Sequence, residues 1–158
     1  MKITLRPANQ KDIMQIFNLA NDTLVRQYSF KTKIIKLTDH KKWFLEKLKD
    51  KNSLILIAEK DNQFVGQVRF DFGDENIIGV SICPMFRGKG IGSKLIIEGI
   101  EFVQNIRPSI ENIIAYIKIE NTASIKSFEE AGFSFDNKLI IDNQQALRYV
   151  YISGETNA

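Results

Sequence analysis

The hydrophobic period of the chain changes at a glycine-rich turn near residue 90, and this change constrains the fold more than any other feature. Before the turn, the apolar residues of segments 53–58, 64–70 and 77–82 alternate or run together as in β-strands, with polar turns between them. From Ile91 to Val103 the apolar residues follow a helix face instead. Antiparallel strands that lead into a helix predict a mixed sheet flanked by helices, an α/β or α+β fold. The chain, residues 1–158, has the length of one domain.

Shorter segments complete the predicted order of elements. They are a strand over 3–6, a helix from Asn9 to about Ala20, a helix that begins at Thr38 or Asp39, a strand over 113–117, a helix that begins at Asn121 or Thr122 and closes at Gly132, and a hairpin of 133–141 and 146–152. The polar tail, 153–158, is expected to be frayed.

Charge and rare residues exclude several kinds of function. The chain has 22 Lys and Arg against 19 Asp and Glu, and its basic residues are scattered, so we expect no nucleic-acid partner. Cys83 is the only cysteine and His40 the only histidine, which excludes an internal disulfide and disfavours a metal site. This cysteine usage fits a reduced, cytoplasmic compartment. We expect no membrane partner, because no apolar run has the length of a membrane span or the character of a signal peptide.

The glycine-rich turn reads Arg87-Gly88-Lys89-Gly90-Ile91-Gly92 and opens the predicted helix. Glycines at alternate positions let the backbone amides approach a ligand, and a helix N-terminus adds partial positive charge. Together with Arg87 and Lys89 these features predict a cradle for phosphate or diphosphate. The alternative is a glycine-rich connection without a ligand. Neither the Walker loop nor the dinucleotide fingerprint fits the spacing.

At this point the residues resemble a known family. The run from Arg87 to Gly92 matches the Arg/Gln-x-x-Gly-x-Gly/Ala motif of the GNAT N-acetyltransferase superfamily. The segment from Asn121 to Phe133, with Ser124 and Phe128, resembles that superfamily's second signature, and the order of elements is similar from residue 3 to about 152. The resemblance implies a mostly antiparallel sheet of about seven strands, about four helices, and a splay between strands four and five. It also implies acetyl-CoA as cosubstrate, no metal, and an amine acceptor.

The resemblance assigns cofactor-binding roles along three segments: the fourth strand, the glycine-rich turn and the second signature. The diphosphate would lie on the amides from Gly88 to Ser93, and the pantetheine arm would pair with the fourth strand, where the Ile82 amide would polarise the thioester carbonyl. The residues assigned in this way are Val80, Ile82, Cys83, Arg87, Gly88, Lys89, Gly90, Ile91, Gly92, Ser93, Asn121, Ser124 and Phe128. Many relatives carry a tyrosine acid at the position of Phe128, and a phenyl ring has no proton to donate. The thiolate would then leave unassisted, or take its proton from water, Tyr116 or Ser124.

The sequence alone gives candidates for the base and for the acceptor contacts but does not decide between each candidate role and its alternative. Glu75 and Asp71 are candidate bases for an ammonium that must lose a proton before attack, and the alternative for each is a solvated turn. The N-terminal third, with Arg26, His40 and Trp43, is similar to acetyltransferases of amino-sugar nucleotides, which implies contacts to the acceptor's phosphates or sugar. The alternatives are a surface salt bridge for Arg26, a local backbone bond for His40 and core packing for Trp43. Cys83 fits a small buried hydrophobe better than a nucleophile.

The leading hypothesis is direct acetyl transfer from acetyl-CoA to a primary amine in a ternary complex, with an amino-sugar nucleotide as the preferred acceptor. The first alternative is the same chemistry on a protein N-terminus, a ribosomal protein or another small amine. The second is a non-catalytic acyl-CoA sensor. In the family that the chain resembles, the final strand often joins dimers, so the resemblance implies a homodimer.

Overall fold

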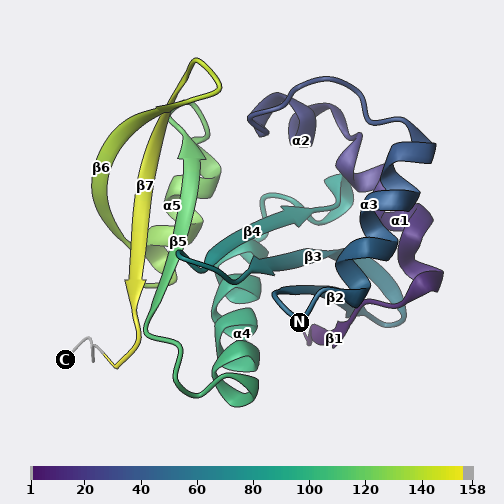
Figure 1. Ribbon diagram of the computed structural model, residues 1–158, viewed down its shortest axis with the longest axis horizontal. Coiled ribbons are helices and arrows are strands. Elements are labelled where there is room, and N and C mark those ends of the chain that lie inside the picture. The colour runs from purple at the N-terminus through teal and green to yellow at the C-terminus, as the bar shows by residue number, and fades with distance from the viewer. Residues whose placement is uncertain (1, 155–158) are drawn as a thin grey trace.

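In the computed structural model, which describes residues 2–154, a seven-stranded sheet carries helices on both faces (Figure 1). In chain order the elements are β1 (Thr4–Pro7), η1 (Gln10–Asp12), α1 (Ile13–Ala20), α2 (Thr23–Tyr28), α3 (Leu37–Lys49), β2 (Ser53–Lys60), β3 (Gln63–Asp71), β4 (Ile77–Ile82), η2 (Pro84–Phe86), α4 (Ile91–Ile106), β5 (Asn112–Lys118), α5 (Thr122–Glu130), β6 (Ser134–Ile141) and β7 (Gln144–Ile152). The predicted mixed fold is confirmed. Within the predicted tail, Ser153 and Gly154 form a turn, and residues 155–158 lie outside the described part.

The described chain has five α-helices where about four were predicted, and α2 is the helix that the sequence did not indicate. It has six residues, too few for an apolar period to show. Its N-cap is Asp22, whose carboxylate accepts hydrogen bonds from the amides of Leu24 and Val25 at 3.1 and 3.2 Å. No helix in residues 2–154 is long and apolar enough to span a membrane.

The sheet opens between β4 and β5, as predicted. The strand order is β1-β2-β3-β4-β5-β7-β6, and β4 and β5 are its parallel pair. They pair at one position, Ile77 with Ile114, whereas β3 and β4 pair from Gly66/Ile82 to Asp71/Ile77. Beyond Ile77 the two strands diverge (Figure 1). We call the opening between them the β4–β5 gap.

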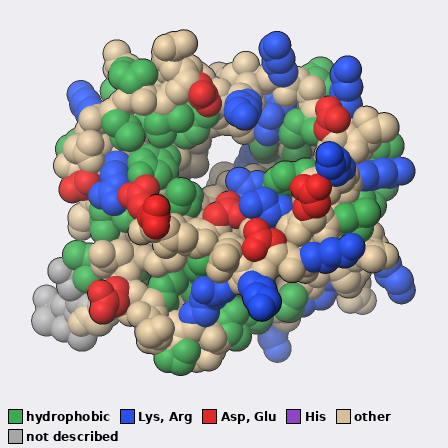
Figure 2. Space-filling view, viewed as in Figure 1, with side chains coloured by type: hydrophobic (Ala, Val, Ile, Leu, Met, Phe, Trp, Pro, Cys, Tyr) green, Lys and Arg blue, Asp and Glu red, His purple; other side chains and the backbone are tan. Residues whose placement is uncertain are grey.

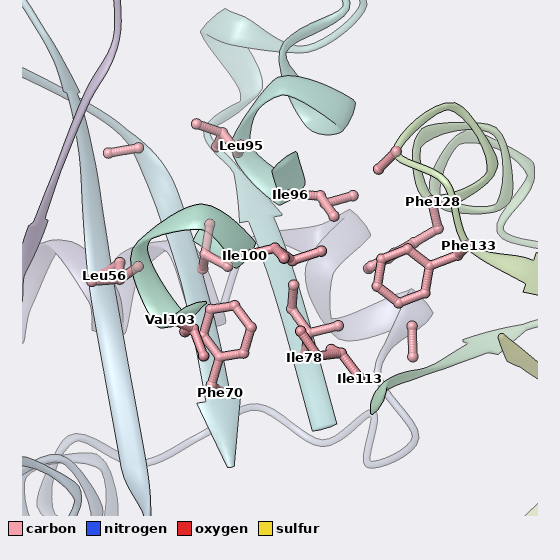
Figure 3. Packing of buried hydrophobic residues seen from close by; sticks show 14 of the residues in the cluster. Leu56, Phe70, Ile78, Leu95, Ile96, Ile100, Val103, Ile113, Phe128 and Phe133 are labelled. Atoms are coloured by element: carbon pink, nitrogen blue, oxygen red, sulfur yellow. The ribbon is translucent and has the colours of Figure 1, made fainter. Parts of the chain in front are cut away.

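Two apolar layers hold the sheet. On one face α4 and α5 cover a large cluster that includes Phe70, Leu95, Ile100 and Ile113 (Figure 3). Burying each of these side chains stabilises the fold by roughly 1.5–3 kcal/mol relative to exposure. A Cβ at Gly99 of α4 would lie 3.0 Å from Val68 Cγ1, so glycine there lets the helix approach β3 closely. The other face packs against α1 and α3 through a smaller cluster of Ile16, Phe44, Ile55 and Ile57.

Candidate active site

The free edge of β4 points its backbone groups into the β4–β5 gap. The Cys83 amide donates to the Val65 carbonyl of β3 at 2.8 Å, so the backbone groups of Cys83 point toward β3. Ser81, two residues earlier and paired with Gln67, points its backbone groups the same way. Because backbone groups alternate sides along a strand, the amides of Val80 and Ile82 face away from β3 and toward the gap. Beyond Ile77, no described residue of β5 pairs with them. An extended ligand can therefore add to this edge as a strand would.

The glycine-rich turn brings bare amides to the same end of β4. Gly88 and Gly90 have φ of +75° and +72°, the left-handed region that glycine adopts without strain. A Cβ at either position would meet nothing within 4 Å, so the space beside the turn is open. Gly90 is the N-cap of α4 and provides no side-chain cap, which leaves the first-turn amides, including those of Ile91 and Ser93, without intrahelical partners. This arrangement suits an anion.

Gly92 lies in the same motif but has a packing role. A Cβ there would lie 2.6 Å from Ser127 Oγ of α5, so the glycine allows α4 and α5 to approach each other. The N-terminus of α4 is thereby held against α5, whose own N-cap Asn121 accepts a hydrogen bond from the Ser124 amide at 3.2 Å. Asn121 Nδ2 also donates to Ser124 Oγ at 3.0 Å. The two polar residues of the second signature thus satisfy each other at the start of α5.

Arg87 does not point into the turn. Its Nε donates to the Ile82 carbonyl at 3.0 Å, and its Nη2 pairs with Asp22 Oδ2 at 2.6 Å. The expected phosphate-facing cation therefore holds the end of β4 to the N-terminus of α2. Lys89 is exposed and lies 5.8 Å above the Phe86 ring, so it is the cation of this turn that stands at the open side.

Phe128 belongs to the core. Its side chain is 4% exposed and packs edge-on against Phe133 at 5.0 Å between ring centroids (Figure 3). It has an apolar environment and no acidic proton, so any proton for a departing thiolate comes from another source.

Glu75 is held in a network at the start of β4. It accepts hydrogen bonds from the Tyr116 hydroxyl and from Arg148 Nε and Nη2, the latter two at 3.1 and 2.6 Å. Arg148 also pairs with Asp136 at 2.7 Å. The hydrogen bonds from Tyr116 and Arg148 lower the pKa of Glu75, which weakens it as a base. Burial and the bond to Glu75 raise the pKa of Tyr116, which weakens it as an acid.

Asp71 is also paired. Its Oδ1 accepts from Lys47 Nζ and from Ser53 Oγ, both at 2.9 Å, and these contacts tie α3 to the sheet. Burial acts to raise the pKa of Asp71, but the bond from Lys47 and the charge of Arg69 outweigh it, and the pKa lies below its ordinary value. Neither expected base is a free carboxylate.

The three expected acceptor contacts lie in the N-terminal layer. Arg26 donates to the Ala20 and Lys31 carbonyls at 2.6 and 2.8 Å, and His40 is 2% exposed with Nε2 2.9 Å from the Ile13 carbonyl oxygen. Burial lowers the pKa of His40. Arg26 and His40 are thus held by backbone carbonyls of the N-terminal layer, and neither is free to contact an acceptor. Trp43 packs beside His40 at 5.8 Å and lies under the Arg69 guanidinium at 5.4 Å.

The far end of the β4–β5 gap is bridged by α2 and the segment after it. Lys118 Nζ at the end of β5 donates to the Gln27 carbonyl at 2.7 Å, and Gln144 Nε2 donates to the Phe30 carbonyl at 2.7 Å. Figure 2 shows the molecule hollowed between its β5–β7 side and its α2 side. Sequence reasoning missed Lys118 and Gln144, because a backbone carbonyl as partner leaves no signal in the sequence. These two contacts close this end of the gap.

With this geometry in view, residues 2–134 match the sequence model of the Acetyltransferase (GNAT) domain. The chain belongs to the GNAT acetyltransferase family. Among curated relatives of this acetyltransferase, the putative phosphinothricin acetyltransferase YwnH of Bacillus subtilis is 27% identical over 141 residues, 84% of each chain. The N-alpha-acetyltransferase of Sulfurisphaera tokodaii is 21% identical over 165 residues, 96% of this chain and 87% of the relative.

Two solved structures have the same fold as this GNAT acetyltransferase. The spermidine N-acetyltransferase of Vibrio cholerae with CoA and spermine superposes with a TM-score of 0.86 at 20% identity over 95% of each chain. AAC(6')-Ib with ribostamycin and coenzyme A gives 0.85 at 19% identity over 100% of each chain. Within residues 2–154 of the GNAT acetyltransferase, no group of three His, Cys, Asp or Glu side chains is placed to hold a metal.

Proposed function

We propose that this GNAT acetyltransferase transfers the acetyl group of acetyl-CoA to a small primary amine by direct attack in a ternary complex. The observation that carries the proposal is the unpaired edge of β4 beside the uncapped, glycine-rich N-terminus of α4. The named structural relatives hold CoA together with an amine such as spermine or ribostamycin, which supports the same pair of ligands here.

Each segment has a distinct role in this proposal. The amides from Gly88 to Ser93 hold the diphosphate, with Lys89 adding charge at the open side. The edge of β4 at Val80 and Ile82 holds the pantetheine arm in line with the gap, whereas the expected contact at Cys83 is not available to its amide, which donates to Val65 of β3. The start of α5, at Asn121 and Ser124, borders the cofactor on its far side, and Phe128 supports this wall from the core.

The Ile82 amide is the proposed catalytic group of the chain. It points into the gap, and a fixed N–H there stabilises the negative charge that develops on the thioester oxygen during attack. The amine nitrogen forms the new C–N bond as the C–S bond breaks, and the electron pair leaves with the sulfur. Phe128 offers no proton, so the thiolate leaves unassisted or is protonated by water. The nitrogen loses its proton to water, because the carboxylates of Glu75 and Asp71 are paired.

The bridge over the gap favours a small acceptor. An extended protein N-terminus needs an open groove, whereas the contacts of Lys118 with Gln27 and of Gln144 with Phe30 close this one. An amino-sugar nucleotide needs free cations for its phosphates, and Arg26 already donates to backbone carbonyls. Relatives are named for phosphinothricin, spermidine and aminoglycoside acetylation, so we propose an amine without a nucleotide.

Cofactor binding and turnover test the proposal together. Gly90→Glu puts a negative charge into the cradle, and Gly154→Glu is the matched control, because Gly154 also has a positive φ, +88°, and open space around it. We expect Gly90→Glu to weaken acetyl-CoA binding at least tenfold and the control to leave it unchanged, by calorimetry. The wild type is then assayed with spermidine, kanamycin, phosphinothricin and a peptide N-terminus. If the protein binds acetyl-CoA but turns over no amine, the proposed enzymatic function is wrong and a non-catalytic acyl-CoA sensor is favoured.

A further inference from the structure

Gln67 of β3 points to the face of the sheet that α1 and α3 cover. Val68 and Phe70 face α4, since both lie against Gly99. Their alternate neighbours point the other way: Arg69 lies over Trp43 of α3, and Asp71 pairs with Lys47 of α3. Successive side chains of a strand alternate between faces, so Gln67 shares the face of Arg69 and Asp71.

The side-chain carbonyl of Gln67 is buried and has no partner. Gln67 is 8% exposed, and no described group donates a hydrogen bond to its Oε1. An unpaired buried acceptor destabilises a fold, and native proteins rarely leave one without a hydrogen-bond donor from protein, water or a ligand. Its neighbours do not relieve it: Ile57 opposite it on β2 is apolar, and Arg69 is engaged with Asp71 and Trp43. A ligand that donates a hydrogen bond would complete the site.

The neighbouring strand leaves room for such a ligand. Ser81 lies directly opposite Gln67 on β4, and Gly79 is two residues away on the same face. A Cβ at Gly79 would meet nothing within 4 Å. The φ of Gly79 lies outside the left-handed region, so the backbone conformation does not require glycine there. The small residues Gly79 and Ser81 therefore border open space on the same face of the sheet as Gln67, beside the β4–β5 gap. Ile82, with its gap-facing amide, follows Ser81 directly.

We propose that the acceptor amine enters the space over Gly79 and Ser81, and that the Gln67 side chain turns toward it so that the amine donates a hydrogen bond to Gln67 Oε1. This inference rests on the proposed function and adds the residue that selects and orients the acceptor. A carbonyl oxygen accepts a hydrogen bond from an ammonium or an amine N–H, so this site can hold the acceptor nitrogen. With one N–H held by Gln67, the nitrogen lone pair is directed away from β3, toward a carbonyl carbon at the Ile82 amide.

Gln67→Met tests this site, because methionine keeps the length of the side chain and removes the carbonyl. We expect kcat/KM for the amine turned over best in the panel of spermidine, kanamycin and phosphinothricin to fall about 10- to 100-fold, mainly through KM. The acetyl-CoA Kd should stay unchanged, and Tm should rise or stay constant because an unpaired buried group is gone. Gln63→Met, at an exposed glutamine of the same strand, is the matched control and should change none of these values.

A second variant, Gly79→Leu, fills the space over Gly79 and keeps the glutamine at position 67. It should raise the acceptor KM at least tenfold and leave acetyl-CoA binding intact. Unchanged acceptor kcat/KM in both variants overturns the Gln67 site while the proposed function stands. A lower Tm of Gln67→Met with unchanged acceptor KM gives Gln67 a structural role and also overturns the inference. If the wild type turns over no amine at all, the proposed function fails, and this site fails with it.

Discussion

Arg87 Nη2 lies 2.6 Å from Asp22 Oδ2, and the same guanidinium holds the Ile82 carbonyl through Nε at 3.0 Å. The arginine of the GNAT motif therefore connects the end of β4 to the N-terminus of α2, the helix that bridges the gap. Asp22 serves both contacts, since its Oδ2 also caps α2. The Arg87–Asp22 ion pair thus links β4, which carries the proposed Ile82 oxyanion contact, to α2, which bridges the gap over the proposed acceptor site.

We predict that Asp22→Ala lowers the free energy of unfolding by about 1–3 kcal/mol, measured by urea denaturation. The variant loses the cap of α2 and leaves Arg87 without its partner, and both side chains of the pair are mostly buried. Asp39→Ala is the control, because Asp39 is an exposed acidic residue in the first turn of α3; it should change the free energy by less than about 0.5 kcal/mol. Equal effects of the two variants would contradict the role of the pair.

The contribution of Asp22 should depend on pH. Burial raises the pKa of Asp22, but the hydrogen bonds from Arg87 and from the Val25 and Leu24 amides outweigh it, so the pKa lies below the ordinary value of 3.8. The folded state therefore holds the proton less tightly than the unfolded state. The stabilisation is fully present above pH 3.8 and is lost as the pH falls through the lower folded pKa. The difference between wild type and Asp22→Ala should shrink below pH 3.8 in urea titrations.

We predict that Lys89, rather than Arg87, supplies the phosphate-dependent affinity for the cofactor. Lys89→Ala should weaken CoA binding about three- to tenfold at low salt and leave phosphate-free pantetheine unaffected, because an exposed ammonium acts through screened charge. Arg87→Ala should weaken both ligands equally, since Arg87 positions the Ile82 end of β4. Calorimetry with CoA and pantetheine at two salt concentrations measures this. If Arg87→Ala weakened the binding of CoA but not of pantetheine, Arg87 would contact the phosphates after all.

The pH profile of turnover should follow the acceptor and not a residue of the protein. With Glu75 and Asp71 paired and their pKa values lowered, the amine has to arrive neutral or lose its proton to water. We predict that log kcat/KM rises with a slope of about 1 up to the acceptor's own pKa. Two acceptors of different basicity should give different midpoints. One shared midpoint between pH 5 and 8 would instead reveal a base on the protein, and its loss in Glu75→Gln would identify that base.

The parts of the site that depend on local sequence were predictable. Glycines at 88 and 90 pointed to a positive-φ turn before a helix, and strand periodicity placed Val80 and Ile82 on the fourth strand. The ion-pair partners of the charged residues were not predictable, because they are distant in sequence. Arg87 and Asp22 are 65 residues apart, and Glu75 and Arg148 are 73 apart. Arg148 reaches Glu75 because it pairs across β5 and β7 with Tyr116, a register that no single segment encodes.

His40 illustrates the same limit for the acceptor side. A lone histidine at the start of a helix is compatible with a ligand contact or with the core, and sequence alone does not decide between them. The packing of α3 against α1 decides it, since the His40 ring lies between Phe17 and Phe44 at 5.1 and 5.9 Å. Gln67 gave no signal at all, because a glutamine in a strand becomes notable when its carbonyl proves to be buried without a partner.

We predict that His40→Ala lowers the free energy of unfolding by about 2–4 kcal/mol, because it leaves a cavity among aromatic rings and removes the partner of the Ile13 carbonyl. Burial lowers the pKa of His40 below 6.5, so the unfolded state binds the proton more tightly than the folded state. This contribution to stability is present above pH 6.5 and is lost as the pH falls through the lower folded pKa. Wild-type stability should therefore decline from pH 7 to pH 5, and the slope should be smaller in His40→Ala. Acceptor KM at pH 8 should stay within about twofold of wild type in the folded variant. A large rise in that KM without loss of stability would place His40 at the acceptor after all.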